Sequence, residues 1–93
     1  MAAEKEGQRI AVEIKSFVGL SKVSDLERAV GQYAIYKSWL SRKEPDRTLF
    51  MAIDQEAFNI LFLDISGQVI LEDYEIKVIV VDALKEQIEK WIS

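Results

Sequence analysis

The sequence predicts an α/β fold in which a mixed β-sheet is flanked by helices. Residues 9–17, 48–53 and 76–81 are short apolar runs, and the last is rich in the β-branched side chains that favour strands. Between the first two runs, apolar residues recur at spacings of three and four, as they do along the buried side of a helix. A strand, a helix and a second strand in this order are typical of parallel strands joined by a crossover.

The chain begins with the pattern of a β-hairpin. Its first five residues form one strand, Glu6-Gly7 is a two-residue turn in which glycine supplies the positive φ angle, and residues 9–17 return. With this turn, the numbers of two facing residues add up to 13. The partner of Glu13 would therefore precede Met1.

A long helix follows the hairpin. The Ser-Asp-Leu-Glu capping box at residues 24–27 predicts its start, and it runs to about Ser41. Pro45 and Asp46 stop it. Its apolar positions form one stripe: Leu26, Ala29, Val30, Tyr33, Tyr36 and Leu40.

Shorter elements fill the middle of the chain. Residues 48–53 are predicted to form a buried strand parallel to the one before the helix. Asp54 can cap a short helix over residues 55–61. Residues 64–72, around Gly67, remain open between a helical turn and an irregular segment.

The C-terminal part is predicted to contain a strand and a helix. Residues 76–81 (Ile-Lys-Val-Ile-Val-Val) give the clearest strand signal of the chain. Leu84, Ile88 and Trp91 are spaced i, i+4, i+7, which predicts that residues 83–92 form an amphipathic helix docked on the sheet.

Composition narrows the chemistry. The 93 residues, 49% hydrophobic and 30% charged, suit one globular domain over residues 1–93 with a modest core, for which a partner subunit would add stability. The chain has no Cys and no His, which excludes disulfides, thiolate or histidine metal sites and histidine-based catalysis. We find no stretch that could span a bilayer and no signal peptide, and we expect a cytoplasmic protein.

Charge is unevenly distributed along the chain. The net charge is −4, but residues 1–50 carry nine Lys/Arg against seven Asp/Glu, while residues 51–93 carry three against nine. The net charge is therefore +2 for residues 1–50 and −6 for residues 51–93, so most basic residues lie near the first predicted strands and the helix that follows them. This distribution leaves nucleic-acid binding open despite the acidic total, although solvated surface charge explains most single residues equally well.

The segment Glu13-Ile14-Lys15 is the main candidate for chemistry. Strand side chains alternate, so Glu13 and Lys15 share one face. A Glu-x-Lys pair at the end of a strand is an element of PD-(D/E)XK nucleases. There Glu13 and the Ile14 carbonyl would bind a divalent cation, and Lys15 would steer the attacking water. Alone, the pair is more often an exposed ion-pair face.

Two helix residues support the nuclease interpretation. Gln32 and Tyr36 stand four apart and share a face, from which they can contact phosphate oxygens or the lysine. The alternative is that Tyr33 and Tyr36 pack in the core and Gln32 faces solvent.

Basic and aromatic residues extend this candidate surface. Arg42 and Lys43 follow the same helix and can hold a phosphate backbone, although a helix C-terminus also favours basic residues. Trp39 and Trp91 are expected to serve packing or an interface.

Taken in order, five blocks of the chain resemble the XisH family. The resemblance covers essentially the whole chain and implies a cyanobacterial fdxN element excision controlling factor with a restriction-endonuclease-like fold, acting in DNA rearrangement during heterocyst differentiation with a XisI-type protein as partner. In that pattern Glu13 and Lys15 match Glu-x-Lys, and Gln32 with Tyr36 looks like Gln-x-x-x-Tyr. The blocks are residues 2–5, 10–17, 31–36, 44–49 and 90–92.

The chain departs from the family pattern at its N-terminus. Family members begin with a further helix and strands, which carry the acidic residue paired with Glu-x-Lys, and this chain starts after them. With Glu13 as the one carboxylate, Mg²⁺ would bind weakly or not at all, because it demands near-octahedral oxygen coordination. Three alternatives remain: a preceding segment is absent, a neighbouring subunit supplies the ligand, or the protein is not an enzyme.

A non-catalytic role is the competing interpretation. The acidic C-terminal half and the missing ligand fit a regulatory or protein-interaction module, for instance one that binds a XisI-type partner. A sheet with an exposed edge would also favour a homo-oligomer.

Overall fold

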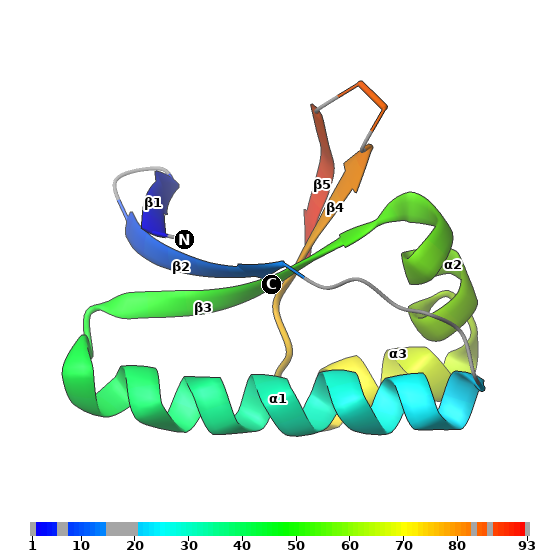
Figure 1. The fold of residues 1–93 in the computed structure, drawn as a ribbon, viewed down its shortest axis with the longest axis horizontal. Coiled ribbons are helices and arrows are strands. Elements are labelled where there is room, and N and C mark those ends of the chain that lie inside the picture. Colours follow the sequence, from blue (N-terminus) through cyan, green and yellow to red (C-terminus); the bar gives the residue numbers. More distant parts are fainter. Residues whose placement is uncertain (1, 6–7, 15–20, 83, 86, 93) are drawn as a thin grey trace.

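Five strands form one mixed sheet in the order β1-β2-β3-β4-β5 (Figure 1). The computed structural model describes residues 2–5, 8–14, 21–82, 84–85 and 87–92, with side chains from residue 21 onward. The order of the strands in the sheet is the same as their order in the chain. The strands are β1 (Ala2–Lys5), β2 (Gln8–Ile14), β3 (Arg47–Asp54), β4 (Val78–Asp82) and β5 (Gln87–Ile92).

The N-terminal hairpin has the predicted register. β1 and β2 are antiparallel, and Ala2 pairs with Ala11 and Glu4 with Arg9, so that facing numbers add up to 13. The predicted turn at residues 6–7 and the predicted continuation of β2 through residues 15–17 lie outside the described residues.

β2, β3 and β4 run parallel, and for β2 and β3 this is the pairing that the strand-helix-strand order predicts. α1 (Lys22–Lys43) connects β2 to β3, and α2 (Gln55–Phe62) with α3 (Ile65–Asp73) connects β3 to β4. Figure 1 shows α1 and α3 along one side of the sheet, from which the two hairpins bend away. The mixed α/β architecture is thus confirmed. None of the helices in the described residues is apolar over a length that would cross a membrane.

The main core lies between the helices and the sheet. A smaller cluster on the other face contains Phe50 and Ile79, and the ring of Trp91 meets that of Phe50 edge-on with centroids 5.3 Å apart. Because strand side chains alternate, β3 contributes to both clusters. The buried residues of the main core are Ala29, Tyr33, Leu49, Met51, Ile53, Phe58, Leu61, Phe62, Leu71, Ile76, Val78 and Val80.

Side-chain caps fix where the helices begin. The predicted start of α1 at Ser24 is wrong by one turn: Ser21 is the N-cap, and its Oγ accepts the Ser24 N–H at 3.0 Å. Ser21 has an extended backbone (φ −163°, ψ 154°), as an N-cap requires, whereas Ser24 is already helical. Asp54 caps α2 as predicted, and Asp64 caps α3, which settles the open segment as helix.

The predicted C-terminal helix is wrong, because residues 87–92 form β5. This strand pairs antiparallel with β4, with Ile79 opposite Trp91. The i, i+4, i+7 spacing covers too few residues to decide between helix and strand, and pairing with β4 satisfies the backbone while Trp91 packs on Phe50. Leu84, expected on the buried side of that helix, is 98% exposed.

Candidate functional site

The Glu-x-Lys segment lies where parallel strands end. Glu13 pairs in register with Met51, and Ile14, the last residue of β2, pairs with Ala52. Met51 is buried in the main core on the helix-covered face. Lys15 lies outside the described residues. The structure therefore places the backbone of Glu13 and Ile14 at the carboxyl edge of the sheet, beside the end of β3.

Tyr33 fixes how α1 lies on the sheet. Its buried hydroxyl donates to the Leu49 carbonyl of β3 at 2.9 Å and accepts the Lys77 N–H, just before β4, at 3.2 Å. Lys37, one turn further along α1, lines a pocket together with Glu75 and Lys77. One flank of α1 therefore faces β4. Because β2 lies on the other side of β3, the opposite flank of α1 faces β2.

The β2-facing flank of α1 carries both predicted helix residues. Helical spacing puts Asp25, Gln32, Tyr36, Trp39 and Lys43 in one stripe on the side opposite Lys37. Gln32 is half-buried, whereas Tyr36 is 40% and Trp39 60% exposed, with ring centroids 5.8 Å apart. Gln32 and Tyr36 thus share a face as predicted. Of the two tyrosines that the alternative interpretation placed in the core, only Tyr33 is buried there.

The basic pair is not brought to the same place. Arg42 and Lys43 are exposed in the last turn of α1, near the start of β3 and hence at the amino edge of the parallel strands. Asp25 in the first turn and Lys43 are separated by about 27 Å of helix, from the rise of ~1.5 Å per residue. Gln32, Tyr36 and Lys43 therefore follow one flank of α1, and the predicted contact residues do not all gather around Glu13.

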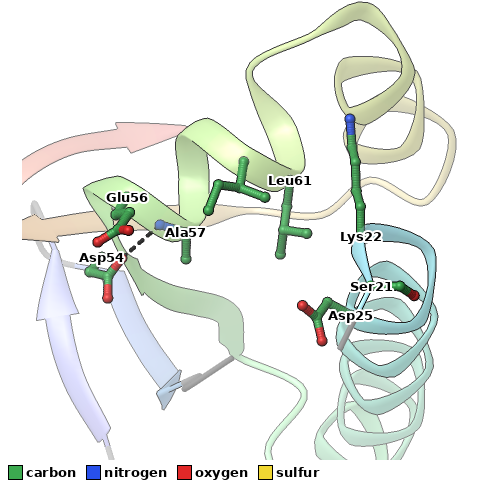
Figure 2. Close-up of a pocket in the computed structure, with 8 residues that line it drawn as sticks. Ser21, Lys22, Asp25, Asp54, Glu56, Ala57 and Leu61 are labelled. Carbon is green, nitrogen blue, oxygen red and sulfur yellow. Dashed lines mark hydrogen bonds between the residues drawn. The ribbon is translucent and has the colours of Figure 1, made fainter. Parts of the chain in front are cut away.

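A pocket of about 320 Å³ opens at the carboxyl edge of the sheet, between the start of α1 and α2 (Figure 2). Its charged lining residues are Lys22, Asp25, Asp54 and Glu56. Asp54 Oδ1 accepts the Ala57 N–H at 2.7 Å and so serves as a cap. Within the described part of the chain, no three acidic side chains are close enough to hold a metal ion by themselves.

Asp25 is the residue of this pocket that sequence reasoning missed. Its side chain is only 6% exposed, and its Oδ1 has no hydrogen-bond partner among the described residues. Arg28 Nη1 lies 4.0 Å from that oxygen, at the outer limit of an ion pair. The available signal was its spacing of seven residues from Gln32, which places both on one helix face.

The nearest lysine on the pocket wall is engaged elsewhere. Lys22 Nζ donates to Asp64 Oδ2 across the gap between α1 and α3. This hydrogen bond, with those from the Gly67 N–H and the Ser66 hydroxyl, lowers the pKa of Asp64 from 3.8 to about 2. The ammonium group that could have neutralised Asp25 is therefore paired with another carboxylate.

Comparisons with known proteins place these features in context. The family model described as XisH protein matches residues 1–89. The chain is 33% identical to an XisH family protein from Nostoc punctiforme PCC 73102 (TM-score 0.89), covering 99% of this chain and 73% of that one. It is 36% identical to a fdxN element excision controlling factor protein from Anabaena variabilis (TM-score 0.88), with 99% and 72% covered. No curated protein matches the chain.

Proposed function

Because the chain belongs to the XisH family, we propose that it acts as a controlling factor for the excision of a DNA element, through a restriction-endonuclease-like fold. The solved relative from Anabaena variabilis is described as such a factor, and its fold matches over 99% of this chain. The observation that carries the proposal is the position of Glu13 at the carboxyl edge of parallel strands, on the side of β3 that the flank with Gln32 and Tyr36 faces.

The proposed chemistry is hydrolysis of a phosphodiester. Glu13 and the Ile14 carbonyl would hold Mg²⁺, for which oxygen donors in a chain without His or Cys are suited. When bound, the cation supplies charge stabilisation and an activated water. Lys15 would orient that water, and Gln32 and Tyr36 would contact phosphate oxygens. The orphaned oxygen of Asp25 at the same edge supports the placement of a cation there.

The length of α1 supports a DNA backbone running along its β2-facing flank. Arg42 and Lys43 are exposed at the far end of the helix, about 27 Å from its first turn. This distance is roughly eight base pairs of B-DNA at 3.4 Å per step. In this arrangement the two basic residues neutralise phosphates away from the scissile bond, so they contribute affinity rather than chemistry.

A nicking assay on supercoiled DNA tests the enzymatic part of the proposal. We expect Mg²⁺-dependent conversion to open circles, lost with EDTA and reduced at least about a hundredfold in Glu13→Ala and Lys15→Ala, because the cation and the attacking water depend on them. Asp73→Asn, an exposed carboxylate at the end of α3, serves as the matched control. Equal activity in all four proteins would identify a contaminating nuclease and contradict the proposal.

A second candidate is a non-catalytic interaction module. Ile35 and Trp39 are exposed large apolar side chains on α1, an arrangement suited to a protein partner such as a XisI-type protein. We expect a complex with that partner in size-exclusion chromatography, weakened by Trp39→Ser and unaffected by Val69→Ser on α3. The absence of any complex would remove this candidate.

Self-association is tested in the same series. β1 and β5 are the outer strands of the sheet, and an unpaired strand edge favours a homo-oligomer. Sedimentation that does not change with concentration, at the monomer mass, would exclude it.

A further inference from the structure

Asp25 is a buried carboxylate for which the surrounding protein provides little compensation. Its side chain is 6% exposed, and Oδ1 lacks any hydrogen-bond donor among the described residues. Removing a charged group from water without a partner is costly, and native proteins rarely tolerate it. We therefore expect Asp25 Oδ1 to contact a cation or a hydrogen-bond donor of a bound ligand.

The neighbouring cations do not fill that role. Lys22 donates to Asp64, the N-cap of α3. Arg28 approaches no closer than 4.0 Å, and its own side chain is 43% exposed, so most of its charge is solvated. Asp25 nevertheless lines the pocket between the start of α1 and α2, as Figure 2 shows.

The place of Asp25 in the fold brings it to the Glu-x-Lys strand. α1 begins at the carboxyl edge of the sheet, where β2 ends one residue after Glu13. Asp25 stands in its first turn, on the flank that faces β2, and Glu13 pairs with Met51 of the helix-covered face. The topology therefore places both acidic residues at one edge of the sheet, and the register of Glu13 with Met51 places Glu13 at a position of the helix-covered face.

We propose that Asp25 is the second carboxylate ligand of a divalent-cation site at this edge, together with Glu13. The inference rests on the cation-binding role of Glu13 in the proposed function, and it supplies an acidic ligand from within this chain. Asp54 also lines the pocket, but its Oδ1 already caps α2, which leaves one oxygen for any other contact. A bound cation would satisfy the orphaned oxygen, and the pocket leaves room for the waters that Mg²⁺ retains.

Binding of Mn²⁺, measured directly by electron paramagnetic resonance and by calorimetry, tests this assignment without reliance on activity. We expect one Mn²⁺ per chain, displaced by excess Mg²⁺. Asp25→Asn should weaken binding at least tenfold, and Glu13→Gln should do the same. Asp73→Asn, which removes one acidic residue far from this edge, should bind as the original protein does.

Each outcome separates the two proposals. Loss of binding in Glu13→Gln with unchanged binding in Asp25→Asn would overturn the assignment of Asp25 and leave the role of Glu13 standing. Absence of Mn²⁺ binding by the original protein would overturn the assignment, while the partner and nicking experiments would still decide the function. Circular dichroism verifies that the variants fold, and Asp25→Ser replaces Asp25→Asn if the latter does not.

Discussion

The start of α1 and the corner between α2 and α3 are joined by the Lys22–Asp64 ion pair. Each contains an aspartate near a helix start, but the two carboxylates differ in their hydrogen bonds. At the corner, Asp64 accepts from Lys22, Ser66 and the Gly67 backbone. In α1, Asp25 is buried with an orphaned oxygen. A carboxylate whose bonds are all made by its own protein stabilises the fold, whereas one left unpaired is a candidate for binding.

Gly67, at the corner between α2 and α3, and Gly31, in α1, differ in how closely other atoms approach them. A Cβ at Gly67 would collide with the Leu61 carbonyl oxygen and lie 2.5 Å from the Phe62 Cα, because α3 starts against the end of α2. A Cβ at Gly31 of α1 would meet nothing within 4 Å. The corner between α2 and α3 is therefore tightly packed, whereas α1 is open around Gly31.

The largest effect is expected for Gly67→Ala. Its methyl group would overlap backbone atoms that cannot rotate away, so α2 and α3 must separate, at a cost of about 3 kcal/mol in the free energy of unfolding. Urea denaturation followed by circular dichroism measures this change.

Gly31→Ala is the matched control for that experiment. It should stabilise the protein by about 0.5–1 kcal/mol, since alanine is the better helix former and the site is open. Similar effects of both substitutions would contradict the contrast between the two regions.

Asp25→Asn is expected to change the free energy of unfolding less than Gly67→Ala does, and to raise it rather than lower it. In EDTA, loss of a buried charge whose Oδ1 has no hydrogen-bond donor and only a distant ion-pair partner should raise stability by about 1 kcal/mol, or roughly 4–8 °C in Tm for a chain of this size. Excess Mn²⁺ should stabilise the original protein more than the variant, because the original protein binds it more tightly.

Glu27→Gln, an exposed neighbour in the same helix, should change Tm little in either buffer. Destabilisation by Asp25→Asn in EDTA would show instead that Asp25 serves the fold, through Arg28 or through the helix dipole.

Local patterns were sufficient to predict much of this fold. The hairpin turn predicted from the sequence led to the register that β1 and β2 have, and the strand-helix-strand order predicted the parallel pairing of β2 with β3. Both depend on backbone geometry over a few residues. Trp91 shows where this fails: its helical spacing is real, but contact with Phe50 and pairing with β4 decided the structure.

The candidate site was predictable to a similar extent. The shared face of Gln32 and Tyr36 follows from helical spacing alone. The importance of Asp25 could not be predicted, because its burial and the missing hydrogen bond at Oδ1 are properties of the tertiary structure. In the sequence, Asp25 lies inside the Ser-Asp-Leu-Glu segment, where an acidic residue is expected at the start of any helix.

The smallest effect on Tm is expected for substitution of Asp64, whose carboxylate accepts hydrogen bonds from Lys22, Ser66 and Gly67. Because the pKa of Asp64 is lowered to about 2 by Lys22, its contribution to stability is present above pH 3.8 and is lost as the pH falls towards 2. The Tm difference between the original protein and Asp64→Asn should therefore be constant from pH 5 to 7 and shrink between pH 4 and 2. Lys22→Met should lower Tm at pH 5 to 7 and lose this effect between pH 4 and 2, whereas Asp73→Asn should change Tm little at any of these pH values. A difference that persists unchanged at pH 2 would mean that Asp64 acts only as a neutral cap, and the contrast with Asp25 would then lie in burial rather than in charge.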